Sequence, residues 1–319
     1  MRLFDAYLFV DFSSSSRPRT GADSIWIADG WFSGGRLRGV VRANPATRRE
    51  GERWLRERIG LHQRKGRRAL VGFDFPLGYP DGSLGASWRT LWRHLAAEVQ
   101  DDERNHNNRF ELARRLNEAV GERWFWGCPR AFASARLAPT KLGRGSVPEY
   151  RVVERKLLAA GRRPFSVWQL LGSGSVGSQA LLGLPICERL RADLGSVAVW
   201  PFETGLRCPA RDGPAVVLCE IWPSLLEVPR DGVRDEEQVL AYVRAAASRD
   251  AAGTLREWFE VPGLAGKDRA LAESEGWVLG FNPRPAAPAG TRFRSPRTAP
   301  TSAAASAGRR SRPSAAAAR

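Results

Sequence analysis

The chain has 319 residues, of which 43% are hydrophobic and 26% are charged, and this composition is typical of a globular protein. No apolar run approaches the roughly eighteen residues that a membrane-spanning helix needs, so we expect a soluble protein without membrane association. The four cysteines form no Cys-x-x-Cys pair and the three histidines lack ligand spacing. This pattern argues against a zinc site and predicts a reducing, cytoplasmic location.

The formal net charge of +16 is unevenly distributed along the chain. No acidic residue follows Glu275, whereas eight arginines lie in residues 284–319, so this segment carries +8 and the remainder about +8. Because the segment is mostly Pro, Ala, Ser and Arg, it cannot build a core, and we expect a disordered basic tail or a non-adaptive extension. Residues 1–283 are expected to form one domain, whose charge permits phosphate binding without demanding it.

The first part of the chain predicts the element order β-β-β-α-β. Four segments have the apolar pattern of strands and are bounded by turn residues: 6–10, 24–28, 36–42 and 69–73. Thr47, with Glu50 three residues later, predicts a capping box. The helix between the third and fourth strands is therefore expected to run from Thr47 to about residue 59.

Residues 80–194 have a different character and predict a helical insertion against one face of the sheet. Four helical stretches alternate there with Gly- and Pro-rich segments: 87–99, 108–119, 149–160 and 178–193. Strand patterns return at 196–202 and 215–222. Asp235 is expected to cap a helix that runs to about residue 247, and a last element is expected to end at residues 277–279.

An acidic residue closes the first and the fourth predicted strands, Asp11 and Asp74 respectively. If these strands are parallel neighbours, both carboxylates emerge at the carboxyl edge of the sheet, where open α/β sheets bind ligands. Two carboxylates so near each other repel, so protons or divalent cations must offset their negative charge. Oxygen ligands favour Mg²⁺ or Mn²⁺. A pair of such ions about 3.5–4 Å apart can activate water and stabilise the leaving oxygen of a phosphodiester.

Several motifs resemble one bacterial protein family. In chain order they are Phe9-Val10-Asp11-Phe12-Ser13, Gly72-Phe73-Asp74-Phe75-Pro76-Leu77-Gly78, Trp168-Gln169-Leu170-Leu171-Gly172, Trp200-Pro201-Phe202-Glu203-Thr204, Cys219-Glu220-Ile221-Trp222-Pro223 and Glu275-Gly276-Trp277-Val278-Leu279-Gly280. Together with the element order, they resemble the family called domain of unknown function 429, whose members are predicted nucleases with an RNase H-like fold. The resemblance implies an α/β fold with an RNase H-like mixed sheet. Some relatives carry a label that links them to molybdopterin guanine dinucleotide synthesis.

The resemblance also implies a set of metal-binding and catalytic acids. Asp11, Asp74 and Glu220, which closes the next strand, would be ligands of Mg²⁺ or Mn²⁺. The fourth acid of nuclease relatives usually lies on the last helix, where Asp235 is the best match and Asp268 the reserve. The acid that the first helix contributes in RNase H has no secure counterpart here, which puts catalysis in question rather than the fold.

Each of these acids also has a purely structural alternative. Asp11 and Asp74 would serve equally as caps of the turns that follow their strands. Glu220 would look the same if it were a buried partner of an arginine, and Asp235 would look the same as a helix N-cap.

Two polar segments are expected to lie beside the acids. Ser13 and Ser14 follow Asp11 and are candidates for phosphate contact, with a plain polar loop as the alternative. Gly172 and Gly174 belong to a Gly-x-Gly-x-x-Gly stretch. Dinucleotide binding would need a preceding buried strand and an acid about 20 residues further on. Because the chain offers neither clearly, we expect a loop whose backbone amides contact phosphate.

These expectations describe a metal-dependent phosphodiester hydrolase that acts on nucleic acid or a nucleotide. The alternative is a non-catalytic or small-molecule-binding protein whose cleft holds a nucleotide or a pterin-type cofactor. A third interpretation, a protein-interaction scaffold, predicts no metal binding and no effect of the acids beyond stability. The sequence indicates no particular protein partner.

Overall fold

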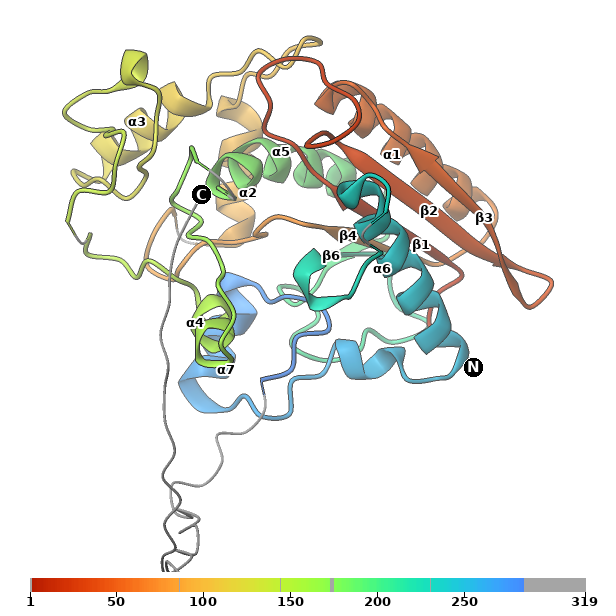
Figure 1. The fold of residues 1–319 in the computed structure, drawn as a ribbon. Coiled ribbons are helices and arrows are strands. Elements are labelled where there is room, and N and C mark those ends of the chain that lie inside the picture. The colour runs from red at the N-terminus through yellow and green to blue at the C-terminus, as the bar shows by residue number, and fades with distance from the viewer. Residues whose placement is uncertain (1, 86, 144, 173–174, 230, 284–319) are drawn as a thin grey trace, which may run out of the picture. The chain divides into compact units, whose positions relative to one another are not determined.

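A six-stranded mixed sheet forms the centre of the molecule in a computed structural model that describes residues 2–283, except 86, 144, 173–174 and 230. The strands are β1 (Ala6–Asp11), β2 (Trp26–Ser33), β3 (Arg36–Ala43), β4 (Ala69–Phe73), β5 (Val197–Val199) and β6 (Val216–Glu220). Their spatial order is β3-β2-β1-β4-β6-β5 (Figure 1). β1, β2 and β3 are antiparallel neighbours, whereas β1, β4, β6 and β5 run parallel to one another.

The sequence of the strands explains their positions. β1, β4 and β6 are continuous apolar runs, and strands of this kind are buried on both faces of a parallel sheet. β3 lies at an edge and carries three arginines on a largely exposed strand, which discourages pairing with another chain. The apolar core therefore lies on both sides of the three central strands.

Helices cover the two faces of this sheet. They are α1 (Arg48–Arg64), α2 (Trp88–Glu98), α3 (Arg109–Ala119), α4 (Val152–Ala159), α5 (Gly177–Asp193), α6 (Arg234–Ala251) and α7 (Gly266–Glu275). One core packs α1, α2, α3 and α5 against the side chains of Leu8 and Val10. The other packs α4, α6 and α7 against Tyr7 and Phe9. Figure 1 shows α6 on the opposite side of the sheet from α1.

The predicted order β-β-β-α-β and the four helices of the insertion are confirmed. The expectation that the insertion lies against one face of the sheet is wrong, because α4 packs into the core that contains α6, whereas α2, α3 and α5 pack into the other core. The capping box of Thr47 and Glu50 is also present at the start of α1. The predicted end of the second strand is wrong, because β2 continues through Asp29 to Ser33. Asp29 is fully buried, and it accepts hydrogen bonds from His62 Nε2 at 2.9 Å and from Arg58 at 2.7 Å. These partners offset the free-energy cost of burying the Asp29 carboxylate inside the sheet.

Two expectations concern the membrane and the tail. Within residues 2–283, apart from the gaps given above, no helix is long and apolar enough to cross a membrane. The predicted disordered tail, residues 284–319, lies outside the described residues.

The loop after Asp74 depends on a close approach between two elements. Gly183 of α5 packs against the ring of Phe75, and a Cβ at this glycine would lie 2.3 Å from Phe75 Cζ. We therefore expect Gly183→Ala to lower the free energy of unfolding by about 1–3 kcal/mol, as overpacked cores do. Urea unfolding followed by tryptophan fluorescence measures this change.

The matched control for this variant is Gly60→Ala in α1, where the nearest atom is the flexible end of Arg64. Because alanine favours the helix over glycine by up to about 1 kcal/mol, Gly60→Ala should be neutral or stabilising. Equal effects of the two substitutions would contradict the packing argument.

Candidate functional site

Asp11 and Asp74 meet at the carboxyl edge of the sheet, as their positions at the ends of parallel neighbouring strands predict. Val10 and Phe73 are paired across β1 and β4. Two hydrogen bonds join the segments just beyond this pair. Asp74 N donates to Val10 O at 3.2 Å, and Phe12 N donates to Asp74 Oδ1 at 2.8 Å. Side chains alternate along a strand, so both aspartates point to the face that α6 covers.

The electrostatics of this pair are unfavourable for two separate negative charges. Burial and the neighbouring Asp74 carboxylate raise the pKa of Asp11 well above its usual range. Burial also raises the pKa of Asp74, although hydrogen bonds from Phe12 N and from Asp11 oppose that rise. In the absence of a cation, these effects favour protonation of the pair over two separate negative charges.

Asp235 is the third acid at this edge. It lies in the first turn of α6, and burial raises its pKa as well. The prediction that it caps the helix is wrong, because Val233 occupies the N-cap position. The carboxylate instead accepts a hydrogen bond from Asp23 N at 2.7 Å, and its charge raises the pKa of both Asp11 and Asp74.

A cavity of about 380 Å³ opens in front of these acids. Its lining includes all three carboxyl groups together with Ser13, Ser14 and Gly172. The structure thus brings together most of the residues that the sequence singled out. Gly174, the remaining one of the predicted loop contacts, lies outside the described residues.

Glu220 is not brought to this cavity. It is paired with Phe73 across β4 and β6, so its side chain points to the face opposite Asp74. There it is 4% exposed, and its two oxygens accept hydrogen bonds from Arg151 at 2.7 and 2.8 Å and from Leu77 N at 3.0 Å. The structure thus favours the alternative of a buried glutamate with an arginine partner over the predicted metal ligand. The reason is that Glu220 is paired with Phe73 and not with Asp74, and neighbouring residues along a strand point to opposite faces.

The reserve acid, Asp268, lies on α7 and forms an ion pair with Lys156 at 2.6 Å. It does not line the cavity around Asp11. This acid has a surface partner, so it serves below as a control position.

Three further residues of the cavity were not found by sequence reasoning. Gln179, in the first turn of α5, donates a hydrogen bond to Phe12 O and so anchors the chain next to Asp11. Trp222 and Phe165 supply aromatic surface to the lining. The position of Trp222 just past the end of β6 is a usable signal, since strand ends meet at this edge. No sequence pattern marks Phe165.

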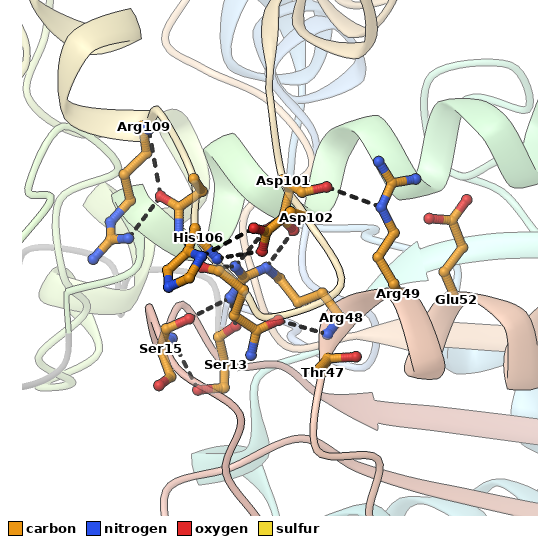
Figure 2. Close-up of polar contacts among 12 residues, drawn as sticks. Ser13, Ser15, Thr47, Arg48, Arg49, Glu52, Asp101, Asp102, His106 and Arg109 are labelled. Atoms are coloured by element: carbon orange, nitrogen blue, oxygen red, sulfur yellow. Dashed lines mark hydrogen bonds and ion pairs between the residues drawn. The ribbon is translucent and has the colours of Figure 1, made fainter.

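The serine loop, residues 13–16, is held in place by a buried arginine of α1. Arg48 donates to Ser13 O at 3.2 Å and to Ser15 O at 2.7 Å (Figure 2). Its other nitrogens bind both oxygens of Asp101 at 2.6 Å. Because the guanidinium is 1% exposed and fully paired, it fixes the loop rather than offering charge to a ligand.

The donor set at the cavity suits a hydrated divalent cation. Among the described residues, no group of three or more His, Cys, Asp or Glu side chains has metal-holding geometry. Mg²⁺ differs from zinc in this respect, because it keeps several water ligands and is commonly bound through one or two carboxylates. The pKa values of Asp11 and Asp74 both stay raised, because no positive charge among the described residues offsets their burial and the repulsion from neighbouring acids. A close pair of carboxyl groups of this kind suits binding of a hydrated Mg²⁺ ion.

The raised pKa of Asp74 predicts a specific pH dependence of stability without divalent cations. The pKa of Asp74 is raised from 3.8 to about 7, so the folded state holds a proton that the unfolded state releases between these values. Folding stability of the wild type should therefore fall as pH rises from 4 to 7. Asp74→Asn removes this loss, and we expect the variant to gain about 1–2 kcal/mol relative to wild type at pH 8.

Thermal unfolding in a chelating buffer at pH 4 and pH 8 measures the difference. The gain of Asp74→Asn should vanish at pH 4, where the aspartate is protonated in the folded protein. A variant that is less stable than wild type at pH 8 would mean that Asp74 is an ordinary turn cap.

Comparison of the chain with family models, with curated proteins and with solved structures found no match. The family resemblance of the motifs stays a prediction, and the functional argument rests on the geometry of the site.

Proposed function

We propose that this protein is a metal-dependent phosphodiester hydrolase with an RNase H-like sheet, which acts on nucleic acid or a nucleotide. The observation that carries the proposal is the pair of Asp11 and Asp74 at the ends of neighbouring parallel strands, where both line an open cavity. Carboxyl groups whose pKa values are raised by burial and by neighbouring acids in a cavity are typical of functional sites.

The arrangement of the sheet supports the RNase H-like assignment. Three antiparallel strands are followed by α1 and by β4, which returns parallel to β1, and β6 then extends the parallel half. Acids at the ends of β1 and β4 in this order agree with the resemblance of the motifs. The helices from α2 to α5 form an insertion between β4 and the last two strands.

In this proposal Asp11 and Asp74 would hold Mg²⁺ or Mn²⁺, whose positive charge would favour the ionised form of both carboxylates. Asp235 faces the same cavity and is the third acid, in place of Glu220, whose oxygens are occupied by Arg151. A bound divalent cation lowers the pKa of a water ligand and stabilises negative charge on phosphoryl oxygens. The protein's own part is to hold two carboxylates at a fixed position through Phe12 N and the strand pairing.

The remaining lining supports a phosphorylated, aromatic substrate. Trp222 and Phe165 offer flat surfaces for stacking of a base, and Ser13 and Ser14 offer hydroxyl groups for phosphate oxygens. A nucleic-acid strand contains both kinds of group in one molecule. It therefore uses more of this lining than a free phosphate would.

The test is incubation of the full chain with single-stranded, duplex, hybrid and branched nucleic acids in Mg²⁺, in Mn²⁺ and in a chelator. We expect cleavage of at least one substrate that stops in the chelator. Absence of cleavage across the panel, combined with saturable binding of a nucleotide or a pterin, would replace the hydrolase with a ligand-binding module.

A further inference from the structure

Arg109, the first residue of α3, is a buried cation without an acidic partner. Its side chain is 7% exposed, and Nη1 donates to Ser16 Oγ at 2.9 Å and to Asn107 Oδ1 at 2.7 Å. The buried Nε has no hydrogen-bond partner, and Nη2 donates to no described residue. A buried guanidinium normally binds a carboxylate or a phosphate, because an unpaired buried charge is costly.

The acid nearest in this network is already occupied. Asp101 binds Arg48 through both oxygens, and among the described residues it forms no ion pair with Arg109 (Figure 2). Burial and the charge of Arg48 lower the pKa of Arg109 to about 10. The group formed by Arg48, Arg109 and Asp101 therefore has one positive charge in excess at neutral pH.

This excess charge lies at the far end of the loop that borders the acid cavity. Ser13 and Ser14 line the cavity, whereas Ser16 contacts Arg109. Arg17 follows, exposed to solvent, and it forms no ion pair with the described residues. Three residues span at most about 10 Å, so the distance from Ser13 to Ser16 is short on the scale of a nucleic-acid strand.

The loop is also held rigidly enough to present these groups. Arg48 binds the carbonyl oxygens of Ser13 and Ser15, and Asn105 donates to the carbonyl oxygen of Arg17 at 3.1 Å. Fixed donors lose little conformational entropy when they bind an anion.

We propose that Arg109, Ser16 and Arg17 bind a backbone phosphate of the nucleic-acid substrate, a few nucleotides away from the phosphodiester at the acids. The inference rests on the proposed function for its substrate class, since the loop connects this position to the acid cavity. Arg109 supplies Nη2, Ser16 its hydroxyl group and Arg17 its exposed guanidinium. Such contacts fix the register of the strand and carry no sequence preference.

The experiment measures binding separately from cleavage. Fluorescence anisotropy in a chelating buffer measures the binding of a labelled oligothymidylate of about twelve nucleotides. The wild type, Arg109→Gln and Arg17→Gln are compared at several salt concentrations. We expect each substitution to weaken binding severalfold and to reduce the slope of log affinity against log salt by about 0.7–1. Glutamine keeps a donor for Ser16, and Arg17→Gln tests the site even if Arg109→Gln folds poorly.

The matched control is Arg114→Gln, which removes a charge from the same helix. Arg114 is partly exposed and already paired with Glu111 and Glu118, so its loss should change neither affinity nor slope. Inorganic phosphate and thymidine monophosphate serve as competitors. If either displaces the oligonucleotide as effectively as unlabelled oligothymidylate does, the site binds a small phosphorylated ligand and the strand assignment is overturned.

The outcomes separate this inference from the hydrolase proposal. Binding that depends on Arg109 and Arg17 without any metal-dependent cleavage supports the phosphate site and contradicts the hydrolase. Cleavage by the wild type with unchanged binding by both variants supports the hydrolase and overturns the phosphate site. Failure of the wild type to bind the oligonucleotide also overturns it.

Discussion

Arg151→Met is expected to destabilise the protein by about 3–5 kcal/mol, which is the usual cost of breaking a buried ion pair from one side. Arg151 is fully buried and neutralises Glu220 and Glu154, which are 4% and 6% exposed. It also donates to Glu275 O at 3.2 Å, so it joins α4 to the end of α7. Methionine leaves both glutamates buried without a cation. Urea unfolding followed by tryptophan fluorescence measures the loss.

The double variant Arg151→Met with Glu220→Met is the control for this argument. The double variant removes the unpaired Glu220 carboxylate and leaves only Glu154 without a cation, so part of the lost stability should return. If the single variant loses less than about 1 kcal/mol, Glu220 is not a structural partner of Arg151, and its role as a metal ligand would have to be considered again.

Asp11→Asn is expected to reduce metal-dependent cleavage about a thousandfold while the protein remains folded. The substitution removes one of two carboxylates proposed to hold the cation, whose contribution to the transition state is several kcal/mol. Because burial and the neighbouring Asp74 raise the pKa of Asp11 and so disfavour its charged form, a neutral amide there should cost little stability. Initial rates on the substrate identified by the panel, at saturating Mn²⁺, measure the effect.

Asp268→Asn is the matched control, because it makes the same acid-to-amide change in a partly exposed ion pair with Lys156, away from the cavity. It should cleave at the wild-type rate. Similar rates for Asp11→Asn and wild type would remove Asp11 from the proposed metal site.

The meeting of Asp11 and Asp74 could be predicted because it depends on local patterns. Each lies at the end of an apolar run whose pattern predicts a buried strand. The ends of neighbouring parallel strands lie at the same edge of the sheet. The error at Glu220 arose at the same level of reasoning. It is the last residue of β6, whereas Asp74 follows β4, and that single step turns the side chain to the other face.

Contacts between distant segments explain what the sequence could not reveal. Arg151 reaches Glu220 across 69 positions, and Arg109 reaches Ser16 across 93. The buried Asp29 has its partners on α1, so its place within β2 follows from tertiary contact and not from strand propensity. No local pattern encodes such pairings.

The central claim is that Asp11 and Asp74 form a divalent-cation site, and calorimetric titration of the full chain with Mn²⁺ tests it most directly. The account predicts saturable binding to the wild type at pH 7.5 and a loss of at least about tenfold in affinity in folded Asp74→Asn, with Asp268→Asn unchanged. Binding that is absent from the wild type, or that is equal in the wild type and Asp74→Asn, would contradict it.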